Sequence, residues 1–236
     1  INIPTGKDSL SMTQKYKDQV VYSPGTVIIS ASAAVSDIRK IVEPVLVNDP
    51  DSSLIYIDFS GDELKLGGSC LAQVLNQLGD EAPTVVDPVY FSEAFNTVQE
   101  LIEEGAIISG HDISAGGLVV TLLEMCFPNK KGGMAVNIGA FDNSDTAKIL
   151  FSQNPGIIIQ VKDDSGVEER LLENGISFLN IGKPIDERKL FIANGDQNLE
   201  INIDLIRNKW YYSSFLFDSK QSFNGTAKER YTHWAD

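Results

Sequence analysis

A carboxylate, a hydroxyl and two adjacent glycines stand close together in the segment His111–Leu118, whose sequence is HDISAGGL. The segment follows an apolar run at 106–108 and precedes a helical pattern at 118–127. A helix that begins at glycines leaves its first backbone N–H groups without partners, and these groups attract phosphate together with the helix dipole. Mg²⁺ prefers carboxylate and phosphate oxygens. The segment therefore predicts a phosphate site at Gly116 and Gly117, with Asp112 as a ligand of the magnesium that accompanies a nucleotide.

The same residue types also fit an ordinary helix start. Asp112 or Ser114 could be the N-cap, and the two glycines could let the helix pack closely on a strand. A second glycine pair, in Leu66–Ser69 (LGGS), precedes a helical pattern at 70–78. It leaves the same choice between an anion site and close packing.

The N-terminal residues 1–15 are rich in turn-forming types, and Gly6 there precedes Lys7, Asp8 and Ser9. Glycine lets backbone N–H groups approach a phosphate, lysine supplies a positive charge, and serine supplies a hydroxyl. The stretch is not a Walker loop, because the first glycine and the following helix are missing. It is expected to be a loop, either in contact with a ligand or plain.

The composition is that of a globular protein, with 236 residues, 42% hydrophobic residues and a net charge of −14. This acidic balance argues against a nucleic-acid surface, which needs a basic stripe. No apolar run approaches the roughly 20 residues of a membrane helix, and no signal peptide opens the chain. Cys70 and Cys126 form neither a disulfide framework nor a zinc site, so buried free thiols in a reducing cytoplasm are expected. Because the chain begins at Ile1 without a methionine, it is expected to be a piece of a longer protein.

Periodicity predicts an α+β fold in which helices back a mixed sheet. Strands are expected at 26–35, 54–59, 133–138, 155–161, 176–181, 190–193 and 199–203, the last two as a hairpin around Asn194-Gly195. Helices are expected at 70–78, 88–104, 118–127, 144–151 and 167–174. The buried stripe of the 88–104 helix is expected to consist of Val89, Phe91, Phe95, Val98, Leu101 and Ile102. A polar turn cluster at 48–53 predicts a domain boundary, which gives units at 1–47, 48–203 and 204–236.

Three motifs in order carry a family resemblance: Pro4–Met12 (PTGKDSLSM), Leu66–Val74 (LGGSCLAQV) and His111–Leu118. Together they resemble the second half of the synthetase region of the large-type phosphoribosylformylglycinamidine synthases, in the aminoimidazole ribonucleotide synthetase superfamily. The resemblance implies that residues 1–47 end a nucleotide-binding lobe and that 48–203 form the synthetase C-terminal-like domain. The aromatic segment around Trp210, within 204–236, resembles the linker toward a glutaminase domain.

That family makes formylglycinamidine ribonucleotide from formylglycinamide ribonucleotide, ATP and glutamine in purine biosynthesis. The resemblance therefore implies an ATP-dependent carbon–nitrogen ligase with glutamine as amido donor, with Mg²⁺ and ATP or ADP as cofactors. The implied partners are the nucleotide, the ribonucleotide substrate and the remaining domains of the same polypeptide, including a glutaminase domain. Nucleic acid and membrane are not implied. The piece alone is predicted to be inactive.

Residue by residue, Asp112 matches a magnesium ligand, and Ser114 matches a serine that contacts the nucleotide of the second half. In the large enzymes that second nucleotide looks structural. The stretch from Gly6 to Ser9 matches one that touches ATP, metal and substrate in smaller relatives. Lys7 replaces a metal-binding asparagine, so phosphate contact is expected there, and Ser9 matches a substrate-contacting serine.

The central motif departs from the family pattern at one residue. Ala115 replaces an aspartate that many members carry, and the remaining metal ligands are expected upstream of Ile1.

Two rival interpretations remain open. One is another ATP-using member of the superfamily, of the selenophosphate synthetase or thiamin phosphate kinase type. The other is a non-catalytic module whose acidic surface and aromatic tail dock other domains. The second interpretation predicts that Asp112→Ala changes neither nucleotide affinity nor thermal stability with magnesium and ADP.

Overall fold

A computed structural model describes residues 2–9, 12–22, 26–143, 145–223 and 225–233. Within these ranges, the side chains of residues 2, 4, 7–9 and 26 lie outside the described part. The chain forms two compact units, Ile1–Lys40 and Ile41–Asp236. No helix in the described ranges has both the length and the apolar character needed to cross a membrane.

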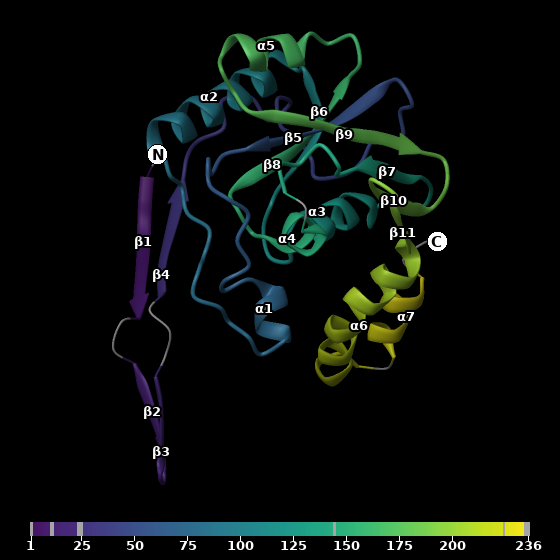
Figure 1. Cartoon of the computed structure of the whole chain (residues 1–236). Coiled ribbons are helices and arrows are strands. Elements are labelled where there is room, and N and C mark those ends of the chain that lie inside the picture. The colour runs from purple at the N-terminus through teal and green to yellow at the C-terminus, as the bar shows by residue number, and fades with distance from the viewer. Residues whose placement is uncertain (1, 10–11, 23–25, 144, 224, 234–236) are drawn as a thin grey trace. The chain divides into compact units, whose positions relative to one another are not determined.

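The first unit consists of two antiparallel strand pairs. β1 (Asn2–Ser9) pairs with β4 (Thr26–Ser32), and β2 (Thr13–Tyr16) pairs with β3 (Gln19–Tyr22) (Figure 1). The predicted loop at the N-terminus is therefore wrong, because β1 finds a β-branched partner strand in β4. Such pairing is non-local, and short-range turn signals do not report it.

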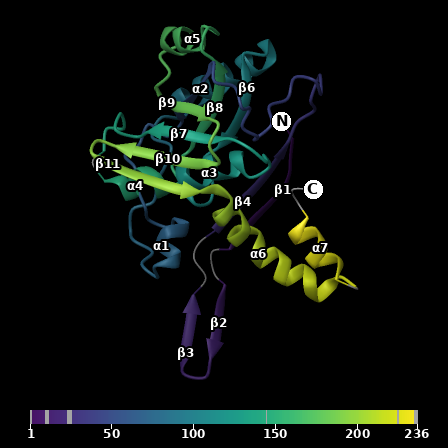
Figure 2. The same cartoon turned by 90° about the vertical axis from the view of Figure 1, so that its right-hand side faces the viewer.

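The second unit contains a seven-stranded sheet with the order β11-β10-β7-β9-β5-β8-β6 (Figures 1 and 2). Its strands are β5 (Ser52–Asp58), β6 (Ile107–Asp112), β7 (Gly133–Asn137), β8 (Gly156–Lys162), β9 (Phe178–Ile185), β10 (Lys189–Asn194) and β11 (Gln197–Asn202). β10 runs parallel to β7, whereas the other neighbours are antiparallel. The predicted mixed sheet of α+β character is thus confirmed.

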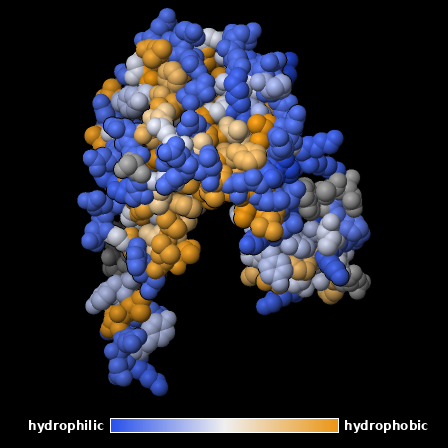
Figure 3. Space-filling model, turned by 45° about the vertical axis from the view of Figure 1, so that its right-hand side comes forward, coloured by the Kyte–Doolittle hydropathy of each residue, from blue (hydrophilic) through white to orange (hydrophobic). Residues whose placement is uncertain are grey.

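The helices of the second unit are α1 (Cys70–Val74), α2 (Pro88–Glu104), α3 (Gly117–Cys126), α4 (Thr146–Phe151), α5 (Val167–Glu173), α6 (Ile203–Gln221) and α7 (Thr226–Thr232). Helices α3 and α4 pack on one face of the sheet, and α2 and α5 pack on the other. Alternation along β5 divides the core: Leu54 packs in the cluster formed by α3 and α4, and Ile55 packs in the cluster formed by α2 and α5. Hydrophilic residues cover most of the face seen in Figure 3, and apolar side chains gather there in separate patches.

For helix α2, the sequence pattern predicted the span correctly and the buried face only in part. Its predicted span is confirmed, because Asp87 accepts from the N–H groups of Val89 and Tyr90, and Gly105 ends the helix at φ +77°. Its predicted buried stripe is partly wrong. Val89 and Phe95 are 65% and 41% exposed, whereas Ala94 is fully buried. Val98 and Leu101 are buried as predicted, so the buried face of this helix is shifted toward Ala94 and away from Val89 and Phe95.

Candidate functional site

Asp112 ends β6, the strand at one edge of the sheet. Its backbone is fixed, since its carbonyl oxygen accepts from Thr121 Oγ1 at 3.2 Å and the next N–H, of Ile113, donates to Gly156 O at 2.8 Å. The Asp112 side chain is 75% exposed. The fold therefore presents a carboxylate to solvent from a rigid backbone position.

The turn after Asp112 leads directly into α3. The N–H of Gly117 donates to Ser114 O at 3.0 Å, and Gly116 is the N-cap residue at φ +96°. No side chain in the described part of the chain caps this helix. The alternative in which Asp112 or Ser114 is the side-chain N-cap is therefore wrong. The start of α3 keeps the uncapped N–H groups on which the phosphate prediction depends.

The glycines of this turn are also required by packing. A Cβ on Gly117, which has φ +74°, would lie 2.6–2.8 Å from backbone atoms of residues 150–152 at the end of α4. A Cβ on Gly116 would lie 2.4 Å from a methyl group of Val120. The glycines do permit close packing, but the neighbour is the end of a helix, so the predicted packing on a strand is wrong. Close packing leaves the exposed Asp112 carboxylate and the uncapped helix start unexplained.

The second glycine pair serves the structure alone. The N–H groups of Gly67 and Gly68 donate to Glu81 O and Leu78 O, both at 2.8 Å. A Cβ on Gly67 would lie 2.2 Å from Glu81 O. Ser69 Oγ caps α1 through the N–H of Ala72 at 3.2 Å. Protein acceptors thus occupy the groups that an anion would need.

Magnesium fits the chemistry of Asp112 but needs further ligands. A carboxylate oxygen is a ligand that Mg²⁺ prefers, and the ion usually keeps several waters and binds phosphate oxygens in addition. The described residues contain no group of three or more His, Cys, Asp or Glu side chains able to hold a metal. The described side chains therefore do not form a complete metal site around Asp112.

The remaining predicted site residues belong to the first unit. Gly6 lies in β1 opposite Ile29, and a Cβ there would meet only Ile28 O, at 3.8 Å. Within the first unit, a larger residue than glycine would therefore fit at position 6 without a clash. The side chains of Lys7 and Ser9 lie outside the described residues.

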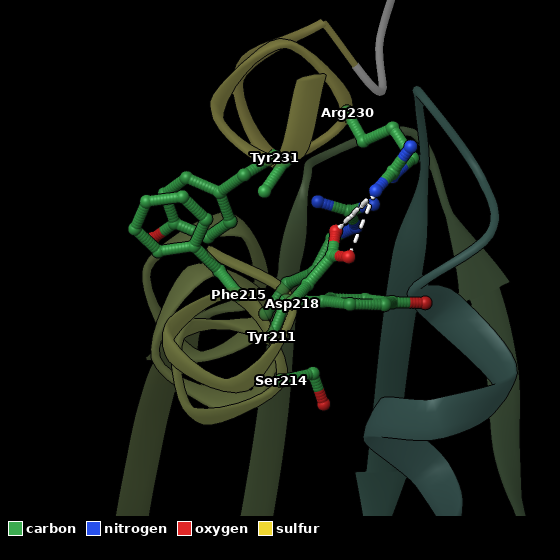
Figure 4. Close-up of a pocket in the computed structure, with 8 residues that line it drawn as sticks. Tyr211, Ser214, Phe215, Asp218, Arg230 and Tyr231 are labelled. Carbon is green, nitrogen blue, oxygen red and sulfur yellow. Dashed lines mark hydrogen bonds and ion pairs between the residues drawn. The ribbon is translucent and has the colours of Figure 1, made fainter. Parts of the chain in front are cut away.

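The structure also contains a cavity of about 350 Å³ between α6 and α7 that was not predicted from the sequence. The only sequence feature that pointed toward it was the cluster of aromatic residues around Trp210. Figure 4 shows Arg230 and Asp218 in direct contact where they line this cavity. Arg230 Nη2 lies 2.8 and 2.6 Å from the two Asp218 oxygens and 2.8 Å from Ser222 Oγ. The Ser222 hydroxyl and Arg230 lower the pKa of Asp218. This ion pair and the stacked rings of Phe215 and Tyr231, whose centroids are 4.7 Å apart, both join α6 to α7.

The chain belongs to the family of AIR synthase related proteins, whose C-terminal domain pattern matches residues 50–193. Two curated relatives are named as probable phosphoribosylformylglycinamidine synthases. The protein from Arabidopsis thaliana, described as chloroplastic/mitochondrial, is 35% identical over 94% of this chain, and the one from Caenorhabditis elegans is 37% identical over 88%. The aligned region covers only 16% and 17% of those relatives, so the chain spans about a sixth of their length.

Solved structures of T. maritima PurL share the fold. The form complexed with ATP aligns with a TM-score of 0.56 and 14% identity, over 78% of this chain and 28% of that chain. The form complexed with FGAR aligns with a TM-score of 0.57 and 16% identity, over 78% of this chain and 31% of that chain.

Proposed function

We propose that the chain is the C-terminal part of the synthetase region of a phosphoribosylformylglycinamidine synthase, where it contributes a magnesium-nucleotide half-site. The observation that carries this proposal is the exposed Asp112 carboxylate on a fixed strand end, next to a ten-residue helix that no described side chain caps. The relatives' names and the family pattern supply the reaction class, ATP-dependent carbon–nitrogen ligation with glutamine as amido donor.

In this proposal each residue has a distinct role. Asp112 binds Mg²⁺, and Ser114 and the backbone at Gly116 and Gly117 bind the nucleotide phosphates. When bound, magnesium neutralises phosphate charge. The N–H groups at the start of α3 add fixed positive dipoles that need no reorganisation when the phosphate arrives. In the first unit, Gly6 contributes to nucleotide binding, and Lys7 and Ser9 bind the ribonucleotide substrate.

The remaining machinery belongs to other parts of the same polypeptide, including a glutaminase domain toward which α6 and α7 lead. The chain on its own therefore gives no synthase activity. Incubation of the isolated chain with ATP, formylglycinamide ribonucleotide and ammonia tests this, and formation of product contradicts it.

A cytoplasmic location is proposed from the two free cysteines, of which Cys126 is buried as expected and Cys70 is only partly buried. The name of the Arabidopsis relative places that protein in organelles. Fractionation of cells that express the tagged parent protein tests the location, and recovery in organelles contradicts it.

The melting temperature with magnesium and ADP tests the half-site. A ligand that binds only the folded state at 100 times its Kd stabilises by about 2.7 kcal/mol, so the wild-type melting temperature should rise. Asp112→Ala should abolish the rise. Asp80→Ala is the matched control, because Asp80 is also exposed and lies in a different loop. If the melting temperature of Asp112→Ala rises as much as that of the wild type, other residues bind the metal. If magnesium and ADP change the melting temperature of neither the wild type nor the variants, the docking-module interpretation is favoured.

A further inference from the structure

His111 lies between two carboxylates. Its side chain is 17% exposed, with Nδ1 at 3.2 Å from Asp112 Oδ1 and Nε2 at 3.3 Å from Glu124 Oε2. The ring is thus in contact with the predicted metal ligand on one side and with helix α3 on the other.

The sheet register explains this placement. His111 pairs with Ile158, whose side chain packs in the cluster formed with α3, so the His111 ring lies on the α3 side of the sheet. The next residue of a strand normally points to the opposite face. Contact between His111 and Asp112 therefore requires the Asp112 carboxylate to turn back over the end of β6.

Helix α3 holds Asp112 by two routes. Thr121 binds the Asp112 backbone carbonyl, and Glu124, one helical turn later, meets the His111 ring that contacts the carboxylate. Residues three apart share one face of a helix. A single face of α3 thus restrains both the backbone and the side chain of Asp112.

The ring contact leaves a carboxylate oxygen available to a cation. A carboxylate only accepts hydrogen bonds, so Nδ1 contacts Asp112 Oδ1 as a donor in the tautomer in which Nδ1 carries the hydrogen. Because this contact is made through Oδ1, Asp112 keeps Oδ2 for the cation. Glu124 Oε2 lies 3.3 Å from Nε2, on the other side of the ring, and limits how far the ring can turn away from Asp112.

We propose that His111, held by Glu124, is a positioning residue that fixes the Asp112 carboxylate in the orientation that binds the divalent cation. This inference rests on the proposed magnesium-nucleotide half-site. It adds that an otherwise exposed side chain is ordered before the cation arrives.

Titration of the whole chain with Mn²⁺ at saturating ADP, followed by electron paramagnetic resonance, tests the inference. His111→Ala should raise the Kd for Mn²⁺ about tenfold, the lower end of the loss that follows removal of a partner of a metal ligand. His111→Gln should recover part of the affinity, because an amide N–H still donates to Asp112. Glu124→Gln should weaken binding less than His111→Ala. Glu103→Gln, on the exposed face of α2, is the matched control and should bind as wild type.

A double variant separates positioning from a general structural role. In the Asp112→Ala background, His111→Ala should cause no further loss of Mn²⁺ affinity, since its effect acts through Asp112. An equal loss in both backgrounds, or wild-type affinity in His111→Ala, overturns the positioning role while leaving the half-site intact. If the wild-type chain with ADP binds no Mn²⁺, the half-site is overturned and the positioning role with it.

Discussion

The two glycine pairs of this chain precede helices in similar sequence contexts and differ in structure. In Leu66–Ser69 both glycine N–H groups bind protein carbonyls, and Ser69 caps the five-residue helix α1. In Ser114–Gly117 the ten-residue helix α3 starts without a side-chain cap, directly after an exposed aspartate. In both turns, a Cβ at one glycine would overlap backbone atoms. Glycine therefore reports close packing in both places, and only the state of the helix start distinguishes a candidate anion site.

The largest effect is expected from Gly117→Ala. The substitution combines a positive φ with overlap against the end of α4, so it should destabilise the fold by about 3 kcal/mol, the sum of left-handed strain and overpacking. Urea unfolding measures the change. Gly175→Ala is the matched control, because Gly175 has φ +66° and open space around its Cβ, and it should cost about 1–2 kcal/mol. Equal losses would mean that α4 moves aside without cost.

Gly67→Ala should have an intermediate effect. Gly67 does not have a positive φ, but its Cβ would lie 2.2 Å and 2.4 Å from the carbonyl oxygen and carbon of Glu81. Overpacking alone should cost about 2 kcal/mol, less than at Gly117. The same unfolding experiment checks the order of the two losses. A loss larger than that of Gly117→Ala would show that the 66–69 turn is the more rigid of the two.

Removal of the serine hydroxyl should reduce the unfolding free energy at the 66–69 turn and leave it nearly unchanged at the 114–117 turn. Ser69→Ala deletes the N-cap of α1 and should cost about 1 kcal/mol. Ser114→Ala should leave the unfolding free energy within about 0.5 kcal/mol of wild type, because no side chain caps α3. Chemical denaturation of both variants measures the difference. A matching loss at Ser114 would reveal a cap at α3 and remove the distinction between the turns.

Local signals predicted much of the fold. The span of α2 follows from Asp87-Pro88 at its start and Gly105 at its end, which act within a few residues. The long-range pairings were not accessible in the same way. β1 forms because β4 lies beside it, and the β10–β11 turn falls at Gly195-Asp196, one residue later than the Asn-Gly signal suggested.

In the candidate site, too, features within a few residues of one another were predictable, and contacts that depend on the tertiary fold were not. Asp112 and its glycine turn are contiguous in sequence, so their proximity was predictable. The contact of His111 with Glu124 depends on α3 folding back along β6, and no local pattern encodes that return. The helix cap was also undetermined, because the sequence offered Asp112 or Ser114 as the N-cap and the structure places Gly116 there.

The smallest expected effect is a pH-dependent change in folding stability caused by Asp62, which lies in the loop that leads to the 66–69 turn. Both Asp62 oxygens lie 2.8 Å from Lys65 Nζ, and this contact, together with the N–H groups of Thr84 and Glu63, lowers the pKa of Asp62. Because the folded-state pKa lies below the unfolded value of 3.8, the stabilisation is fully present well above pH 3.8. It is lost as the pH falls through the folded-state pKa. The stability difference between wild type and Asp62→Asn should therefore shrink as the pH falls from 6 toward 3. Lys65→Gln removes the largest cause of the lowered Asp62 pKa, so the stability of this variant should change less between pH 6 and pH 3 than that of the wild type. If the stability difference between wild type and Asp62→Asn stays constant across this range, Asp62 contributes no proton-linked stability to the turn.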